Sequence, residues 1–158
     1  MLILYRVDDR LVHGQVAEGW VPHLKADELA VVSDEIAADD LRRTIMRFAT
    51  PEGVVLKIMT VDEAAVYLPQ AQASARKVLL LLPGLPEALA LVAGGLKIPS
   101  LNIGGMHYSA GKNLSIGKAI FLSDADCAAL KVLADSGIAI EGRGVPSDSP
   151  VDLMAAIA

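Results

Sequence analysis

Ten residues near the amino terminus gather the side chains of this chain that are best suited to chemistry. They are Arg6-Val7-Asp8-Asp9-Arg10-Leu11-Val12-His13-Gly14-Gln15. An imidazole such as that of His13 can attack phosphorus when a carboxylate binds its other ring nitrogen. The guanidinium of Arg10 offers a fixed positive charge and a planar fork of donors to an anion. These residue types therefore indicate a phosphohistidine site.

The neighbours of His13 support the same chemistry. An apolar run typical of a buried strand, Met1–Tyr5, precedes the segment, and a predicted helix, Gly14–His23, follows it. The amino end of a helix supplies N–H donors to a phosphoryl group, and glycine lets the backbone approach an anion closely. Gln15 belongs to the same supporting loop, and Asp8 or Asp9 is expected to orient the imidazole. A solvated loop histidine among surface charges is the alternative that these residues leave open.

Apolar runs alternate with helical periodicity along the whole chain. The predicted strands are Leu2–Val7, Glu28–Ser33, Val54–Thr60, Lys77–Leu82, Ser100–Ile103, Lys118–Leu122 and Ile138–Gly142. The predicted helices are Gly14–His23, Ile36–Ala49, Val61–Leu68, Glu87–Gly94, Asp124–Asp135 and Pro150–Ile157. This order predicts one α/β domain over residues 1–158, an open, twisted and mainly parallel sheet of about seven strands with helices on both faces.

Other candidate residues follow the strands, because ligands of parallel sheets bind beyond the carboxyl ends of the strands. These second-rank candidates are Arg6, Ser33, Asp34, Pro83, Gly84, Gly104, Gly105 and His107. We expect Asp34 to cap a helix rather than to catalyse. We expect His107 to be an exposed loop residue, although it could line the same cleft as His13.

Composition excludes several classes of protein. The chain has 158 residues, a net charge of −5 and one cysteine, so neither a nucleic-acid partner, an intrachain disulfide nor a cysteine-based zinc site is expected. No glycine-rich nucleotide loop and no carboxylate cluster with magnesium spacing is present, and no metal is expected. Arg6, Asp8 and Asp9 end the first apolar run too early for a secretion signal. Prolines and a glycine interrupt the apolar tract Val78–Leu96, which argues against a membrane span, so we expect a cytoplasmic protein.

The opening motif resembles the signature of the mannose/fructose/sorbose-family IIB components of the bacterial sugar phosphotransferase system. Its pattern is approximately R-I-D-D-R-L-I-H-G-Q-V, and this chain departs from it by valine at positions 7 and 12. Trp20 and the segments Val31–Asp39, Pro51–Val54 and Asn102–Met106 also resemble the family. The likeness therefore covers essentially the whole chain.

The resemblance implies a specific activity. His13 would accept a phosphoryl group on Nδ1 from a phosphohistidine of a IIA protein and pass it to a sugar that enters through the membrane subunits IIC and IID. Arg10 would neutralise phosphoryl charge, and Asp8 and Asp9 would orient the imidazole or the loop. The enzyme would be a phosphohistidine–sugar phosphotransferase that needs no cofactor and associates peripherally with the membrane permease.

Two other classes of function stay open at this point. One is a regulatory or binding module of the same fold that no longer transfers phosphate. The other is a small hydrolase or isomerase with His13 as general base, which would need a deep pocket and a second catalytic group. The apolar composition permits a homodimer without requiring one, and the sugar is not encoded in any recognisable residue.

Overall fold

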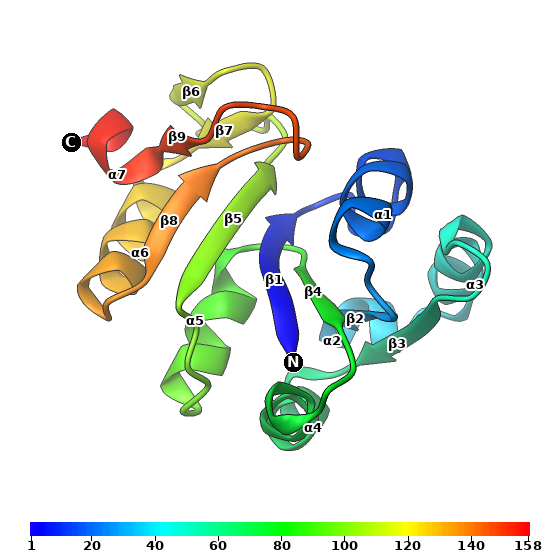
Figure 1. Cartoon of the computed structure of the whole chain (residues 1–158). Helices are drawn as coiled ribbons and strands as arrows, with labels where there is room; N and C mark the ends of the chain where they lie inside the picture. The colour runs from blue at the N-terminus through cyan, green and yellow to red at the C-terminus, as the bar shows by residue number, and fades with distance from the viewer.

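The apolar run that opens the chain forms the centre of a seven-stranded sheet (Figure 1). The computed structural model describes all residues, 1–158, and its strand order is β3-β2-β4-β1-β5-β8-β9. Neighbouring strands are parallel except for the β8–β9 pair. The strands are β1 Leu2–Asp8, β2 Glu28–Val32, β3 Val55–Met59, β4 Val78–Leu82, β5 Ser100–Gly105, β8 Ala139–Gly142 and β9 Val151–Asp152.

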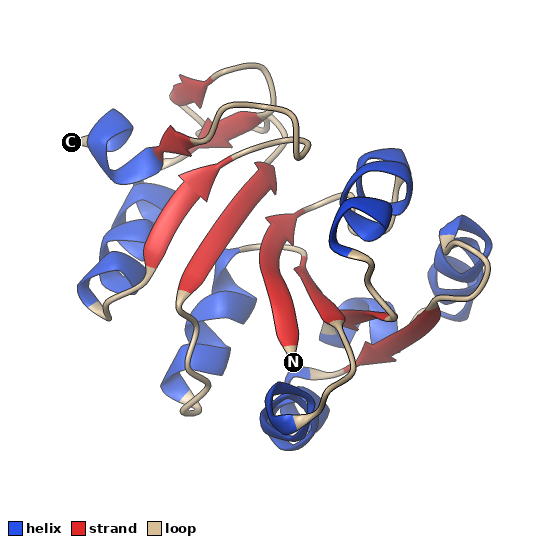
Figure 2. Ribbon diagram, viewed as in Figure 1, coloured by secondary structure: helices blue, strands red, loops and turns tan.

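Helices cover both faces of the sheet (Figure 2). They are the π-helix η1 Gln15–Trp20 and the α-helices α1 Val21–Leu24, α2 Asp34–Ala37, α3 Asp40–Ala49, α4 Val61–Ala73, α5 Leu85–Ala93, α6 Asp124–Asp135 and α7 Leu153–Ile157. On one face, η1 to α3 contribute to a core of 12 buried residues. On the other, α4 to α7 contribute to a core of 26. The predicted α/β class with two covered faces is thus confirmed.

Strand β4 shows how the sequence supplies both cores at once. Leu79 and Leu81 point into the smaller core, whereas Leu80 and Leu82 point into the larger one, and all four are fully buried. Successive side chains of a strand alternate between faces, so a strand covered on both sides must be apolar throughout. β4 pairs in parallel with β1 in the middle of the sheet. The last residue of β1 therefore lies at the carboxyl edge of the sheet.

One predicted strand lies outside the main sheet. Residues 120–122 of the predicted strand Lys118–Leu122 form β7 (Ile120–Leu122), which pairs antiparallel with β6 (Leu114–Ile116) in a separate hairpin. Gly117 has a φ of 64°, a left-handed conformation that suits the turn between the two strands. The seventh strand of the main sheet is instead the two-residue β9, which is too short to leave a sequence pattern.

Three helix predictions were wrong at their boundaries. The predicted helix Ile36–Ala49 is two helices, because the Asp39 side chain accepts a hydrogen bond from Arg42 N at 3.1 Å and begins α3 anew. Helix α4 continues past Pro69, since buried Leu68 and Ala71 hold both sides of the proline against the core. The last helix begins after Asp152, which caps it, rather than at Pro150. No helix of the chain is both long enough and apolar enough to span a membrane.

Candidate functional site

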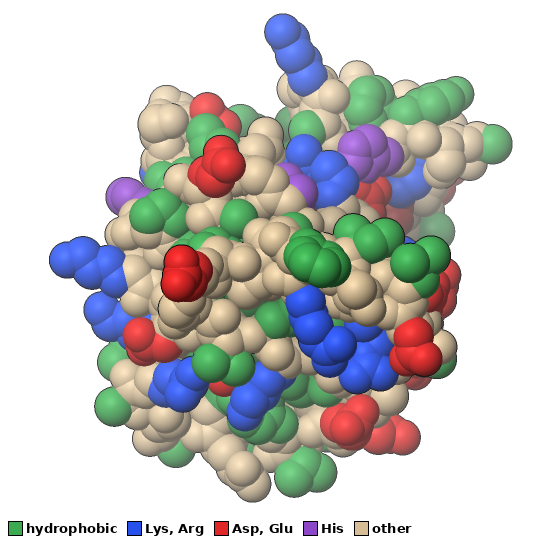
Figure 3. Space-filling view, turned by 90° about the vertical axis from the view of Figure 1, so that its right-hand side faces the viewer, with side chains coloured by type: hydrophobic (Ala, Val, Ile, Leu, Met, Phe, Trp, Pro, Cys, Tyr) green, Lys and Arg blue, Asp and Glu red, His purple; other side chains and the backbone are tan.

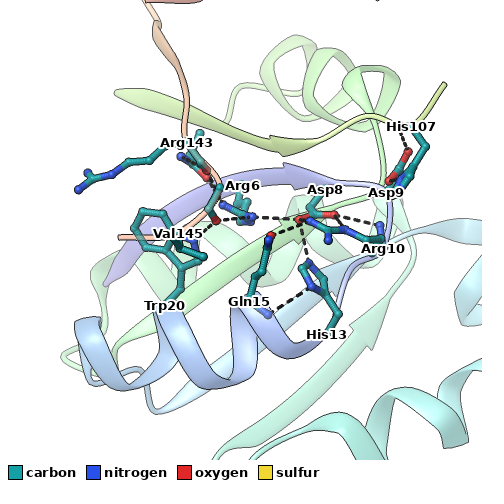
Figure 4. Close-up of polar contacts among 12 residues, drawn as sticks. Arg6, Asp8, Asp9, Arg10, His13, Gln15, Trp20, His107, Arg143 and Val145 are labelled. Atoms are coloured by element: carbon teal, nitrogen blue, oxygen red, sulfur yellow. Dashed lines mark hydrogen bonds and ion pairs between the residues drawn. The ribbon is translucent and has the colours of Figure 1, made fainter. Parts of the chain in front are cut away.

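Asp8, the last residue of β1, is the centre of a polar cluster at the carboxyl edge of the sheet (Figure 4). One of its oxygens, Oδ2, accepts hydrogen bonds from His13 Nε2 at 2.9 Å and from Arg6 Nη2 at 2.9 Å. Arg10 adds a forked contact, with Nε 3.0 Å from Oδ1 and Nη2 3.0 Å from Oδ2. The Asp8 side chain is fully buried beneath these donors.

The ionised form of Asp8 is strongly favoured. Burial alone would raise the pKa of Asp8, but hydrogen bonds from His13 and Arg10, together with the charge of Arg6, lower that pKa well below its ordinary value. Because the carboxylate stays ionised, it can only accept hydrogen bonds. The His13 nitrogen that faces it, Nε2, therefore carries the ring proton.

The other ring nitrogen of His13, Nδ1, is left with its lone pair. The backbone N–H of Gln15 points toward Nδ1 at 3.4 Å, and the His13 side chain is 17% exposed. The loop that presents the ring turns sharply at Leu11, whose φ of 58° is unusual for a residue other than glycine. Leu11 is buried in the smaller core, and this packing holds the turn. The loop thereby presents Nδ1 of His13 near the protein surface.

Arg10 lies beside the imidazole and remains partly exposed. Its guanidinium is held by Asp8 and by Gln15, whose Oε1 accepts from Nη2 at 2.8 Å. The third guanidinium nitrogen, Nη1, makes no hydrogen bond within the chain, and the side chain is 33% exposed. An arginine fixed on one side and open on the other is suited to bind an incoming anion. Sequence reasoning placed Gln15 in this loop, and the structure brings it into the cluster.

Arg6 was a second-rank candidate, and the structure places it at the base of the cluster rather than at its surface. Its side chain is fully buried and donates to Asn102 Oδ1 at 2.6 Å and to the carbonyl oxygens of Arg143 and Gly144, each at 3.0 Å. Burial lowers the pKa of Arg6, against the opposing charge of Asp8. Gly104 leaves the space for this guanidinium, because a Cβ there would lie 2.0 Å from its Cζ.

Trp20 and Arg143 complete the floor of the site. The Trp20 ring centroid lies 5.5 Å from the guanidinium carbon of Arg6 and 5.5 Å from that of Arg143, and its Nε1 donates to the Gly144 carbonyl at 2.9 Å. Sequence reasoning did not identify Trp20, Asn102 and Arg143 as contacts of Arg6. A charged residue buried in a strand, such as Arg6, is the signal that could have prompted a search for them.

Asp9 points away from His13 and binds the loop that follows β5. One of its carboxylate oxygens accepts from the backbone N–H of His107 at 2.7 Å, and the other contacts the His107 ring at Nδ1. The backbone N–H of Asp9 donates to the Gly105 carbonyl at 3.1 Å. The His107 side chain is 62% exposed, as expected for a loop residue. His107 therefore lies at the rim of the cluster and is held there by the second acid of the motif.

Four second-rank candidates lie elsewhere. Ser33, Asp34, Pro83 and Gly84 line a hollow beyond β2 and β4, and no residue of the His13 loop borders it. Ser33 rather than Asp34 caps the next helix, accepting from Ile36 N at 3.2 Å, and Asp34 accepts from Val61 N at 2.8 Å. Both contacts organise helix starts. No cluster of three or more His, Cys, Asp or Glu side chains is placed to hold a metal ion.

Comparison with known proteins yields relatives along nearly the whole chain. The family model described as "PTS system sorbose subfamily IIB component" matches residues 2–158. The chain is 37% identical to the sorbose-specific EIIB component of Lacticaseibacillus casei, over 99% of this chain and 95% of that protein. It is 36% identical to the mannose-specific EIIAB component of Escherichia coli K12, where it spans 96% of itself but only 46% of the longer relative.

Solved structures agree with the sequence relatives. The IIBSor domain of the sorbose permease from Klebsiella pneumoniae matches with a TM-score of 0.91 at 32% identity, covering 99% of this chain and 96% of that domain. The N-acetylgalactosamine-specific IIB component 1 from Escherichia coli matches with a TM-score of 0.88 at 29% identity, over 96% and 98% of the two chains. These matches confirm the resemblance that the opening motif indicated.

Proposed function

Because the chain belongs to the sorbose-subfamily IIB components of the phosphotransferase system, we propose that His13 carries a phosphoryl group between a phosphorylated IIA protein and a sugar. The donor would be a phosphohistidine of IIA, and the sugar would enter through the membrane subunits IIC and IID. The protein would act on the cytoplasmic side, beside that permease. The observation that carries this proposal is the His13–Asp8 hydrogen bond, which leaves Nδ1 as the free nucleophile.

The chemistry requires two displacements at phosphorus. In the first, the Nδ1 lone pair of His13 forms a bond to phosphorus while the bond from phosphorus to the donor nitrogen breaks. In the second, a sugar hydroxyl oxygen attacks the phosphorus, the electron pair of the N–P bond returns to Nδ1, and the hydroxyl proton is released. Phosphoryl transfer of this kind depends mainly on positioning and charge compensation.

The residues around His13 supply both the positioning and the charge compensation. Asp8 fixes the ring and stabilises positive charge on the imidazole during transfer. The backbone N–H of Gln15 points at Nδ1, and Nη1 of Arg10 has no partner in the chain, so both are available to donate to an anion on Nδ1. We therefore propose that no metal or cofactor takes part, since these groups compensate the phosphoryl charge. The site is a surface cluster, which suits a donor that is itself a protein.

Two alternatives are less well supported. A hydrolase with His13 as general base would need a deep pocket around the ring, and His13 lines none of the principal hollows of the surface. A regulatory module without transfer would have no need of a nucleophile that is oriented and left free. The relatives are named for sorbose, mannose, fructose and N-acetylgalactosamine, so the sugar of this chain is a matter for experiment.

The test is phosphorylation by a phosphorylated IIA protein, read by intact mass. We expect wild type to gain one phosphoryl group that is labile in acid and stable in base, and His13→Ala to gain none. His23→Ala and His107→Ala are the matched controls, and each should still gain one group. Phosphorus and nitrogen NMR should assign the group to Nδ1. Uptake by His13→Ala would refute the site, and attachment at Nε2 would refute the role given to Asp8.

A further inference from the structure

The outward face of α3 carries large hydrophobic side chains that the chain itself does not cover. Leu41, Ile45 and Phe48 are 70%, 58% and 86% exposed. Residues that follow one another by four and three positions lie on the same face of a helix, so these three side chains form one stripe. Only Met46 of this helix is buried in the core.

Two further apolar side chains are exposed near the end of the sheet, on the face that α4 covers. Strand β3, next to α3, is the end strand of the main sheet, and its Val55 is 40% exposed. Val66 of the adjoining helix α4 is 66% exposed. Figure 3, which faces the side where α3 lies in Figure 1, shows hydrophobic and basic side chains close together on this surface. An uncovered apolar stripe such as that of Leu41, Ile45 and Phe48 usually marks an interaction site.

The charges beside the stripe identify the partner. Asp40 and Arg47 are seven residues apart, which is two helical turns, so they lie on the same flank of α3. The Asp40 side chain is fully exposed, and its single ion pair, with Arg43, is long at 3.6 Å. Arg47 makes no ion pair and no side-chain hydrogen bond within the chain. One flank therefore has a negative group at the amino end and a positive group at the carboxyl end of the helix.

We infer that the α3 face binds a second copy of this chain, with the two α3 helices packed antiparallel about a twofold axis. In that arrangement Leu41 of each copy meets Phe48 of the other, and the two Ile45 side chains meet near the axis. Each Asp40 then faces the Arg47 of the other copy, because antiparallel pairing brings opposite ends of the same flank together. The apolar stripe and the two flanking charges can therefore each pair with their own copies, as a twofold interface requires.

The same charges disfavour other occupants. An anionic lipid surface or a uniformly acidic protein would be best matched by a uniformly basic rim. Here Asp40 interrupts that rim, and Arg42 is already paired with Glu35 at 2.9 Å. A second copy also leaves the site open, because β3 is separated from β1 by β2 and β4 in the sheet. The inferred dimer is therefore compatible with a protein partner at His13.

The contact is expected to be weak. A stable interface usually buries about 1,600 Å² in total, whereas this contact is centred on one ten-residue helix from each copy. Association should accordingly depend on protein concentration. The proposed phosphoryl transfer does not depend on it, so the two proposals can fail separately.

The experiment is sedimentation velocity of the full chain over a wide concentration range, without any phosphoryl donor. Wild type should shift from monomer to dimer, and Ile45→Asp should stay monomeric. Val132→Asp is the matched control, because Val132 is 56% exposed on α6, outside this face, and should dimerise normally. Asp40→Arg and Arg47→Asp should each weaken dimerisation by about tenfold, and the double variant should recover most of the loss.

Several results would overturn the inference. Wild type that stays monomeric at the highest concentration would do so, as would a dimer that Ile45→Asp leaves intact or a double variant without recovery. Monomeric wild type that floats with phosphatidylglycerol vesicles, and loses that binding in Ile45→Asp, would assign the stripe to a membrane surface instead. Circular dichroism checks that each variant folds, and Phe48→Ser replaces Ile45→Asp if that variant does not.

Discussion

At the scale of single residues, the two neighbouring acids of the motif bind different partners. Asp8 binds the ring nitrogen Nε2 of His13, whereas Asp9 binds the backbone and the ring nitrogen Nδ1 of His107. Asp8 is the last residue of β1, whereas Asp9 begins the turn that follows it and contacts the loop after β5. The first acid sets which nitrogen of His13 is free, and the second fastens the neighbouring loop. Sequence alone left these two roles interchangeable.

Arg10 offers a prediction at the same scale. Arg10→Ala should slow phosphoryl uptake by about 100-fold, the usual cost of removing one preorganised donor. The free energy of unfolding should fall by only about 1 kcal/mol, because the side chain is partly exposed and screened by water. Quenched-flow rates with phosphorylated IIA and urea unfolding measure the two effects. The rate of phosphoryl uptake by Arg10→Lys, which keeps the charge but loses the forked donors, should lie between those of wild type and Arg10→Ala. Equal rates in all three proteins would exclude Arg10 from the mechanism.

At the scale of elements, the sequence predicted what local chemistry dictates. Capping boxes form at Thr60 and Ser123, and the helices that they begin start at the predicted residues, Val61 and Asp124. The His13 cluster was foreseen because its members lie within ten residues of each other. Asn102 and Arg143 were not foreseen, since only the parallel pairing of β1, β5 and β8 brings them to Arg6. Long-range pairing of this kind leaves no local pattern.

The close approach of β5 to Arg6 gives a prediction about this element. In Gly104→Ala, the new Cβ would lie 2.0 Å from Cζ of a buried guanidinium whose Nη1 and Nη2 are both hydrogen-bonded, so either the arginine or the strand must move. The free energy of unfolding should fall by about 3 kcal/mol, the upper range for an overpacked core. Gly14→Ala is the control and should be nearly neutral, because no atom lies within 4 Å of its added Cβ. Chemical denaturation measures the free energy of unfolding of both variants. Equal values for Gly104→Ala and Gly14→Ala would contradict the close packing of Arg6 against Gly104.

At the scale of the whole molecule, the site contributes to folding stability. Arg6 is a buried cation at the junction of β1, β5 and the loop after β8, and Asp8 is its only salt-bridge partner. Replacing one member of a buried pair leaves the other charge uncompensated. The His13 cluster and the packing of β1 against β5 and the loop after β8 therefore depend on the same two side chains.

The pH dependence of unfolding tests this coupling. Since the pKa of Asp8 is lower in the folded chain than in the unfolded chain, its ionisation stabilises the fold above about pH 4 and this contribution is lost as pH falls further. Asp8→Asn should cost about 3–5 kcal/mol near neutral pH, with Arg6 left unpaired. The difference in the free energy of unfolding between wild type and Asp8→Asn should narrow below about pH 4, because protonation of Asp8 there removes the stabilising charge of the wild-type carboxylate. Asp62→Asn, an exposed carboxylate in the first turn of α4, controls for general charge effects. Thermal unfolding at a series of acidic pH values measures this difference in stability. A difference that stays constant with pH would show that ionisation of Asp8 does not stabilise the fold.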